Sequence, residues 1–324
     1  MYSIGELQAV IKKTFDSVSF SHQPSELYDP ITYTLGLGGK RIRPLFLLTG
    51  CDLFCGNISE AEPAIIAIEL FHNFTLLHDD IMDQAPLRRG KETVFRKWNT
   101  NVAILSGDTM FALAYEYISA IDKTVLPEAL SVFTNTARMV CEGQQFDMNF
   151  ETSDRVSIPA YLEMIRLKTA VLIGCSLKLG AILAKAPVTE TEKIYSFGEN
   201  IGMAFQLQDD LLDTFGDTKK FGKEIGGDIS SAKKTFLLLK AYELASDKEK
   251  SELDECFSDP SIPSHQKIER VKNVYQSLHI KEFTLSEIEK YFSKALKLFE
   301  DINVSKDRKH VLEEFTNTLF VREF

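Results

Sequence analysis

Two short acidic motifs, each near the end of a long apolar stretch, are the residues best suited to do chemistry. Each places aspartates at positions i, i+1 and i+4: Asp79, Asp80 and Asp83 in LHDDIMD, and Asp209, Asp210 and Asp213 in LQDDLLD. In a helix, positions i and i+4 share a face, so each motif presents paired carboxylates. Like charges at this spacing destabilise a helix by about 0.2–0.5 kcal/mol, and burial of an uncompensated charge costs more. The motifs therefore require a counter-charge.

Divalent cations are the economical counter-charge for six carboxylates. Ligands that are all oxygen favour Mg²⁺, with Mn²⁺ as an alternative. Mg²⁺ keeps several waters and shares its other positions with substrate phosphates. A solvated helix end would explain one such motif, but two motifs in two apolar helices favour a metal site. We expect the motifs to face one another and to hold a diphosphate through the metals.

Basic residues gather beside these motifs, although the chain is acidic overall, with 37 Lys and Arg against 47 Asp and Glu, a net charge of −10. Arg88 and Arg89 follow Asp83 closely, and Lys223 follows Asp213 by ten residues. The further candidate cations are Lys40, Arg43, Lys168 and Lys233. Cations beside each acidic motif suit a second anion that is bound without metal.

The composition excludes several classes of protein. The chain has 324 residues and a net negative charge, so no general basic surface is available for nucleic acid. The longest apolar stretch, 170–184, is interrupted by Ser176 and Lys178 and is too short to span a membrane. The N-terminal residues lack a signal-peptide pattern, and five scattered cysteines suit a reducing compartment. We expect a cytoplasmic protein.

Helical periodicity dominates the chain, and strand patterns are nearly absent. Ser59 with Glu62 resembles a capping box before the helix of the first acidic motif, and Ser157 with Pro159 resembles the start of another helix. Connections are expected at 86–97, 216–229 and 247–263. The helices are expected at about 2–19, 41–55, 64–83, 98–121, 127–150, 157–184, 191–216, 230–246, 265–279, 282–301 and 307–322. This pattern predicts an all-α bundle of ten or more helices, with residues 1–324 in a single domain.

In order and spacing, the motifs resemble those of the trans-prenyltransferases, the all-trans polyprenyl diphosphate synthases. The resemblance covers essentially the whole chain. Its motifs are GGKRIRP at 38–44, LHDDIMD at 77–83, LRRG at 87–90, Gly107-Asp108, GQQFD at 143–147, Lys168-Thr169 and FQLQDDLLD at 205–213. The family usually has Gly-Lys ahead of the threonine at 235, whereas this chain reads Ala232-Lys233-Lys234.

The resemblance implies the isoprenoid synthase fold around a deep central cavity, and head-to-tail condensation of isopentenyl diphosphate with dimethylallyl, geranyl or farnesyl diphosphate. Three Mg²⁺ ions are implied, two on Asp79 and Asp83 and one on Asp209, with Asp80, Asp210 and Asp213 in or behind the metal shell. A homodimer is also implied. Contacts to the allylic diphosphate are implied for Arg88, Lys168 and Lys223, and contacts to isopentenyl diphosphate for Lys40, Arg43, His72 and Arg89. Lys233 is implied to contact a diphosphate. Thr169 and Gln206 are implied to direct their dipoles toward the developing cation.

Product length is expected to depend on aromatic residues upstream of the first motif. Phe74 and Phe71 precede Asp79 by five and eight residues, which is roughly 7.5 and 12 Å along a helix. Core packing is the simpler explanation for either ring. In the family, a bulky residue at the fifth upstream position stops elongation early. With Phe74 there, Thr75 next to it and no insertion in DDIMD, we expect a twenty-carbon product, with fifteen carbons second.

Three alternatives remain. A regulatory subunit of a prenyl synthase usually lacks one aspartate motif, and a terpene cyclase should lack the basic set of Lys40, Arg43 and Arg89. A phosphohydrolase using the same metals is more distant.

The loop at 217–231 is expected to be mobile without ligand.

Overall fold

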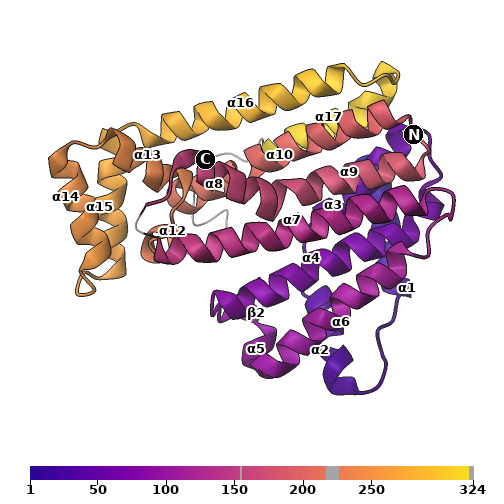
Figure 1. The fold of residues 1–324 in the computed structure, drawn as a ribbon, viewed down its shortest axis with the longest axis horizontal. Helices are drawn as coiled ribbons and strands as arrows, with labels where there is room; N and C mark the ends of the chain where they lie inside the picture. Colours follow the sequence, from indigo (N-terminus) through magenta and orange to yellow (C-terminus); the bar gives the residue numbers. More distant parts are fainter. Residues whose placement is uncertain (154, 217–225, 321–324) are drawn as a thin grey trace. The chain divides into compact units, whose positions relative to one another are not determined.

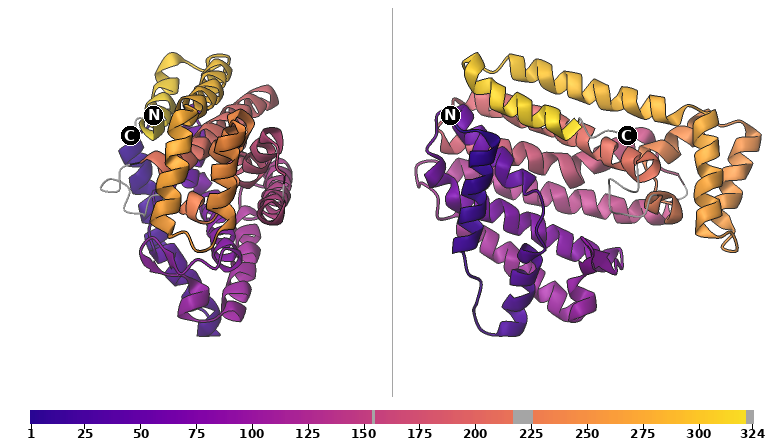
Figure 2. Two further views of the ribbon diagram at one scale, coloured as in Figure 1. Left: turned by 90° about the vertical axis from the view of Figure 1, so that its left-hand side faces the viewer. Right: turned by 180° about the vertical axis from the view of Figure 1, so that it is seen from behind.

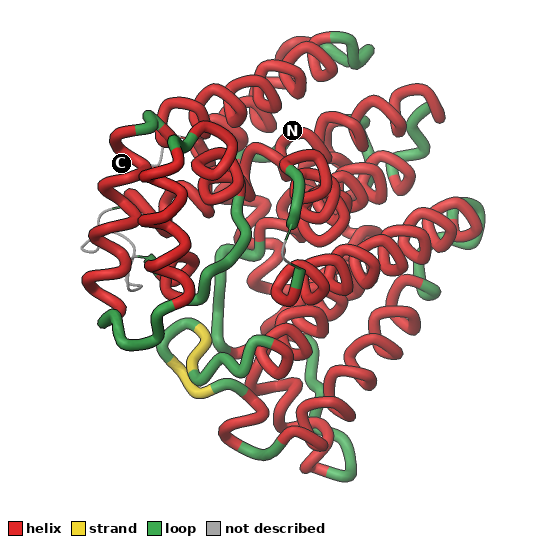
Figure 3. The backbone as a smooth tube through the Cα atoms, turned by 60° about the vertical axis from the view of Figure 1, so that its left-hand side comes forward, coloured by secondary structure: helices red, strands yellow, loops and turns green. Residues whose placement is uncertain are grey.

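The computed structural model describes residues 1–153, 155–216 and 226–320, and this part of the chain is almost wholly helical (Figures 1 and 3). Its residues divide into two compact units. Unit 1 comprises Met1–Ala137, Cys175–Tyr195 and Asn303–Glu313, and unit 2 comprises Arg138–Gly174, Ser196–Ile302 and Glu314–Phe324. The predicted all-α class with more than ten helices is confirmed. That residues 1–324 act as one domain stays a prediction.

Unit 1 holds the first acidic motif. Its own elements are α1 (Ile4–Ser17), α2 (Ser25–Gly36), α3 (Ile42–Leu53), the 3₁₀ turn η1 (Ile58–Ala61), α4 (Glu62–Met82), β1 (Leu87–Arg88), β2 (Lys91–Glu92), α5 (Val94–Lys97) and α6 (Thr100–Ile118). The two strands form a small antiparallel hairpin directly after α4.

Unit 2 holds the second acidic motif. Its own elements are α8 (Ile158–Ile165), the π-helical turn η2 (Arg166–Ala170), α12 (Gly227–Ser230), α13 (Phe236–Leu244), α14 (Asp247–Ser258), α15 (Ser264–Ser277) and α16 (Ile280–Glu300). Four helices contribute residues to both units: α7 (Leu126–Thr152), α9 (Val171–Leu183), α10 (Val188–Phe215) and α17 (Lys306–Phe320).

The first half of helix α4 is buried, and the aspartates of the first motif lie at its C-terminal end. Nearly every side chain from Ala64 to Phe71 is buried, and the helix packs along α6. A helix that is apolar all round belongs in a core. The C-terminal turn, which carries the aspartates, is partly exposed. Burial of one end therefore fixes where the acidic end lies within unit 1.

The helix of the second motif likewise packs its apolar side chains in a core, in unit 2. Leu207 and Leu211 of α10 belong to a core that also includes Tyr161 of α8, Leu237 of α13 and Tyr275 of α15. Helices α14 and α15 form an antiparallel pair, which Figure 2 shows from two sides.

Helix α15 also supports the short helix α12. The two helices pack together, and the hydroxyl oxygens of Ser230 and Ser264 lie 2.7 Å apart. This contact fixes α12 against the rest of unit 2.

Three local expectations were wrong. Residues 247–258 form α14 rather than a connection; Ser246 and Glu249 make a capping box, but only Leu253 and Cys256 are buried, so the apolar periodicity is weak. Helix α2, which has Pro30 in its interior, was not predicted. The stretch 157–184, expected as one helix, is α8, η2 and α9.

The two expected helix starts had different outcomes. Ser59 lies in η1, where Asn57 is the cap, and α4 has no side-chain cap. The Ser157 cap of α8 is confirmed, because its hydroxyl accepts a hydrogen bond from the Ala160 N–H. Among the described helices, none is both long and apolar enough to cross a membrane.

Candidate active site

The first acidic motif ends α4, and its three aspartates differ in exposure. Asp80 is buried with 5% of its surface exposed, Asp79 is half-buried, and Asp83 is exposed. The Asp83 N–H donates to the Asp79 carbonyl over 2.8 Å, so the last turn remains helical. The middle carboxylate therefore turns inward, whereas the outer two stand on the more accessible face.

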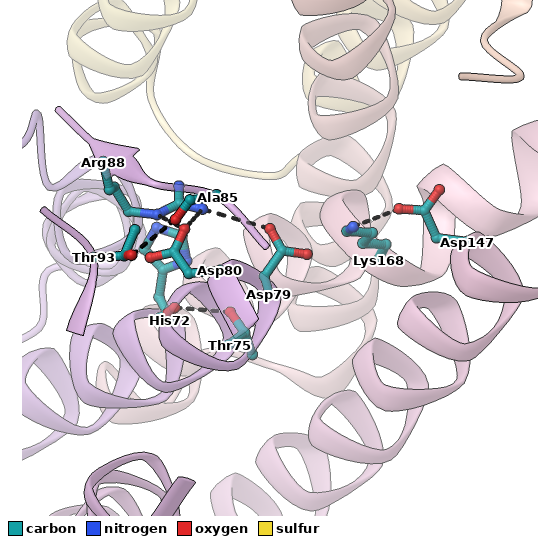
Figure 4. A network of polar contacts seen from close by, with 9 residues as sticks. All are labelled: His72, Thr75, Asp79, Asp80, Ala85, Arg88, Thr93, Asp147 and Lys168. Carbon is teal, nitrogen blue, oxygen red and sulfur yellow. Dashed lines mark hydrogen bonds and ion pairs between the residues drawn. The ribbon is translucent and has the colours of Figure 1, made fainter. Parts of the chain in front are cut away.

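Arg88 on β1 holds the inward-facing carboxylate. Its Nε donates to Asp80 Oδ1 over 2.8 Å, and its Nη2 lies 2.7 Å from the same oxygen and 3.6 Å from Asp79 Oδ2 (Figure 4). Burial raises the pKa of Asp80, and Arg88 opposes that rise. Thr93 fixes the base of the hairpin by donating to the Ala85 carbonyl over 2.8 Å. One arginine thus bridges two of the three carboxylates.

A basic cluster lies in the same unit. Arg43 Nη1 is 3.0 Å from His72 Nε2. Burial lowers the pKa of His72 well below 6.5, and the charges of Arg43, Arg89 and Arg88 lower it further. The imidazole is therefore neutral at pH 7, and because arginine only donates, His72 Nε2 accepts and its Nδ1 carries the proton. Lys40 is exposed in the loop before α3.

Gly39 provides the surface on which Arg89 rests. Its φ is +131°, and a Cβ added at this position would lie 2.6 Å from Arg89 Nη2. No side chain fits between this backbone and the guanidinium. The GGKR motif and the LRRG motif, which are about fifty residues apart in the chain, are therefore in direct contact through a position that requires glycine.

The second acidic motif on α10 also turns its middle carboxylate inward. Asp210 is buried with 5% exposed, and Asp209 is half-buried. The Tyr161 hydroxyl donates to Asp210 Oδ2, and Gln206 Nε2 donates to Oδ1 over 3.0 Å. Burial and the charge of Asp210 raise the pKa of Tyr161 far above its usual value, so its hydroxyl remains a donor. Both oxygens of Asp210 are thus engaged by protein groups.

Asp213 fixes the described segment that begins at Gly226. Its Oδ2 accepts from the Asp228 N–H over 2.9 Å, and its carbonyl accepts from the Gly226 N–H over 2.7 Å. Burial raises the pKa of Asp228 to about 7, and the charge of Asp210 adds to that rise. The third aspartate of the motif therefore holds α12 in place.

Lys168 and Thr169 lie in the π-helical turn η2. Lys168 Nζ donates to Asp147 Oδ2 over 2.6 Å (Figure 4), and Thr169 Oγ1 donates to Gln206 Oε1 over 3.0 Å. A single π turn re-aims the side chains around it and is frequent at functional sites. The structure therefore brings Thr169 together with Gln206 and, through it, with Asp210.

The remaining predicted cations divide into two groups. Lys223 and most of the loop expected to be mobile lie outside the described residues. Lys233 is exposed between α12 and α13, and its charge lowers the pKa of Asp210 and Asp228. The preceding Ala232 adopts φ +54°, a left-handed conformation that favours glycine. This geometry explains the glycine that is usual at this position in the proteins the sequence resembles.

Aromatic rings cluster along α4 below Asp79. Phe71 is fully buried, and its ring centroid lies 5.5 Å from that of Phe133. Phe74 is only half-buried, with its centroid 5.2 Å from Phe111 of α6 and 4.8 Å from His78. The two rings therefore differ: Phe71 packs in the core of unit 1, whereas Phe74 and Phe111 together form a partly accessible aromatic surface.

Sequence reasoning assigned no role to several residues of these clusters. Asp147 closes the GQQFD motif, so the motif itself was the available signal. Tyr161, Phe111 and Asp228 carry no local signal, because each contacts the site only through packing of its helix against another. That the two acidic motifs face one another stays a prediction; the first motif belongs to unit 1 and the second to unit 2.

The donor set fits a metal that is shared with a ligand. Among the described residues, no three carboxylate, histidine or cysteine side chains are grouped as a metal site. Asp79 and Asp83 offer oxygen donors on one face, as Mg²⁺ prefers when one or two carboxylates and substrate phosphates complete its shell. The residues present therefore fit a divalent cation that binds together with a phosphorylated ligand.

Comparisons with known proteins agree over most of the chain. A family model described as polyprenyl synthetase matches residues 24–278. A geranylgeranyl diphosphate synthase of Saccharolobus solfataricus is 38% identical over 272 residues, covering 83% of this chain and 81% of the relative. A crystal structure of a geranylgeranyl pyrophosphate synthase is 45% identical, with a TM-score of 0.94 and 100% of both chains covered.

A further crystal structure carries ligands. A polyprenyl synthase from Caulobacter crescentus CB15, complexed with calcium and isoprenyl diphosphate, is 27% identical with a TM-score of 0.86, covering 99% of this chain and 95% of that chain.

The Gly39–Arg89 contact predicts a specific effect on anion binding. Gly39→Ala should weaken binding of inorganic diphosphate by about tenfold, because the new methyl group displaces the guanidinium. Gly38→Ala is the matched control, since Gly38 also has a positive φ of +76° but has nothing within 4 Å of an added Cβ. Titration calorimetry measures both. Equal losses of affinity in the two variants would mean that backbone strain alone is responsible.

His72 predicts a pH dependence of stability. The pKa of His72 is depressed in the folded protein. The contribution of His72 to the stability of the fold is therefore complete above pH 6.5 and is lost as the pH falls below that value. Between pH 7.5 and pH 5.5, the free energy of unfolding should fall by about 1 kcal/mol on this account. His72→Gln should reduce this fall, whereas replacement of the exposed His265 by Gln should not. Urea unfolding at pH 7.5 and at pH 5.5 measures the fall in the free energy of unfolding for each protein. A fall in His72→Gln as large as that of the wild type contradicts the prediction.

Proposed function

Because the chain belongs to the polyprenyl synthetase family, it is a prenyltransferase, and we propose that it condenses isopentenyl diphosphate head-to-tail with an allylic diphosphate. Its fold is the isoprenoid synthase fold. The observation that carries the proposal is common to both motifs. In each, the middle aspartate is buried and held by protein donors, whereas the first is half-buried and remains the more accessible carboxylate.

In the proposed mechanism, Asp79 and Asp83 would hold two Mg²⁺ ions and Asp209 would hold a third. When bound, the metals neutralise the diphosphate and stabilise the negative charge that develops as it leaves. The protein in turn keeps the carboxylates in place. Arg88 holds Asp80, while Tyr161 and Gln206 hold Asp210, so these side chains maintain the orientation of each motif.

The reaction breaks the C–O bond between the allylic carbon and its diphosphate and forms a C–C bond to isopentenyl diphosphate, which then loses a proton. Arg88, Lys168 and Lys223 are proposed to contact the allylic diphosphate. Isopentenyl diphosphate is proposed to bind Lys40, Arg43, His72 and Arg89. The hydrogen-bonded pair of Thr169 and Gln206 supports a role for their dipoles toward the allylic cation.

For product length, we propose that Phe74 limits elongation and that the main product has twenty carbons, with fifteen second. Its half-buried ring and its contact with Phe111 support this assignment. Phe71, deeper and fully buried, supports Phe74 from below and would limit the product only if that ring were removed. We further propose that residues 1–324 form one polyprenyl synthetase domain and that the protein is a homodimer.

The activity is tested with purified protein, Mg²⁺, labelled isopentenyl diphosphate and each allylic diphosphate in turn. We expect a prenyl diphosphate product whose formation stops when EDTA removes the metal. Asp79→Asn should lower kcat by about 10³-fold, on the scale of losing one charge-stabilising group. Asp29→Asn, at an exposed aspartate of α2, is the control and should change nothing.

The products of the same assay discriminate the alternatives. A terpene cyclase would release a hydrocarbon without consuming isopentenyl diphosphate, and a phosphohydrolase would release an alcohol. A regulatory subunit would form no product alone. Any of these outcomes rejects the proposed condensation.

Phe74→Ala should shift the product toward twenty-five carbons or longer, because it opens the aromatic surface beside Phe111. Phe71→Ala should instead lower stability by about 3–5 kcal/mol, as expected for a fully buried ring, with little change in product. Chromatography of the dephosphorylated products and thermal unfolding measure the two effects. A product distribution in Phe74→Ala that matches that of the wild type rejects the proposal that Phe74 limits elongation.

A further inference from the structure

Glu69 is a buried carboxylate that the proposed mechanism does not use. It lies on α4 with 5% of its surface exposed. An ionised carboxylate at such a position destabilises the fold by several kcal/mol unless opposite charges lie close to it. Its surroundings should therefore supply cations.

Three arginines, two at the start of α3 and one in the hairpin after α4, lie close enough for their charges to act on Glu69. Burial raises the pKa of Glu69, while the charges of Arg43, Arg41 and Arg89 and a hydrogen bond from Asn73 counteract that rise. The charge of Glu69 in turn raises the pKa of Arg41 and Arg89 against their own burial. Three positive charges thus lie close to Glu69, and Asp16 is a second negative charge that raises the pKa of Arg41.

Each arginine also has a contact that restricts it. Arg41 adopts φ +44° at the start of α3, and its guanidinium lies 3.9 Å from the centre of the Phe15 ring. Arg89 rests on Gly39, and Arg43 contacts His72. These contacts orient the side chains, but none offsets the mutual repulsion of three guanidinium groups.

The spacing on α4 places Glu69 behind this cluster. It precedes His72 by three residues and Asn73 by four, so all three share one face of the helix. Glu69 Oε2 has no hydrogen-bond partner among the described residues, although it is buried. The carboxylate therefore acts on the arginines chiefly through its charge.

We propose that Glu69 is a positioning residue whose negative charge holds Arg41, Arg43 and Arg89 together as a preformed site for the diphosphate of isopentenyl diphosphate. Three cations outnumber the two anions, Glu69 and Asp16, so the cluster keeps a net positive charge, which attracts a diphosphate. The substrate would contact the arginines and not Glu69. A site that is already assembled loses less side-chain freedom on binding. The inference rests on the proposed binding of isopentenyl diphosphate at this cluster.

Glu69→Gln tests the inference, because it keeps the shape of the side chain and removes its charge. We expect KM for isopentenyl diphosphate to rise about tenfold or more, while KM for the allylic diphosphate and kcat stay within about threefold. Glu69→Asp keeps the charge and should recover part of the loss. Glu62→Gln, an exposed glutamate on the same helix, is the matched control and should match the wild type.

Two results would overturn the inference. One is an unchanged KM for isopentenyl diphosphate in folded Glu69→Gln. The other is a loss shared equally by both substrates and accompanied by a fall in Tm, which would indicate a packing role.

Arg43→Gln and Arg89→Gln separate this inference from the proposed function. If both arginine variants raise KM for isopentenyl diphosphate and Glu69→Gln does not, only the role of Glu69 fails. If neither arginine variant raises that KM, the assignment of this substrate to the cluster fails, and the role of Glu69 fails with it.

Discussion

Compensation of carboxylates that are buried among apolar side chains is the constraint on which the described structure depends. Asp80 is neutralised by Arg88, Asp210 is held by Tyr161 and Gln206, and Glu69 faces an arginine cluster. Each compensation links a helix to a segment that is distant in the sequence or follows a loop. Contacts between charged side chains therefore hold the loops in place. The apolar halves of the helices in turn fix where those charged side chains lie.

The two acidic motifs use different partners for the same purpose. In unit 1, a charged arginine from a hairpin holds the middle aspartate, and this contact is strong because both groups are ionised. In unit 2, a tyrosine and a glutamine do so without adding charge. The positive charge near Asp210 comes instead from Lys233. The prenyltransferase thus keeps a buried middle aspartate in both motifs, in two different electrostatic surroundings.

Close backbone contacts are as specific as charges in this protein. Arg89 rests on Gly39, and a Cβ at Gly143 would lie 2.3 Å from the Lys168 backbone nitrogen. Neither glycine has a titratable group of its own, although each stands in a motif with charged residues. Their role is to let a cation approach, which explains why the motifs combine glycine with charged residues.

The sequence alone was sufficient to predict the all-α class and the helices of both motifs, because apolar periodicity is a local property, and its motifs were sufficient to predict the family by resemblance. The roles of the candidate site residues stay predictions. The sequence could not predict α14, whose polar surface hides its periodicity, or the π turn at Lys168. It also could not show that Phe71 is fully buried whereas Phe74 is only half-buried, or assign Tyr161 and Glu69. Those distinctions depend on which side chains of other helices pack against each residue, and only the tertiary structure decides that.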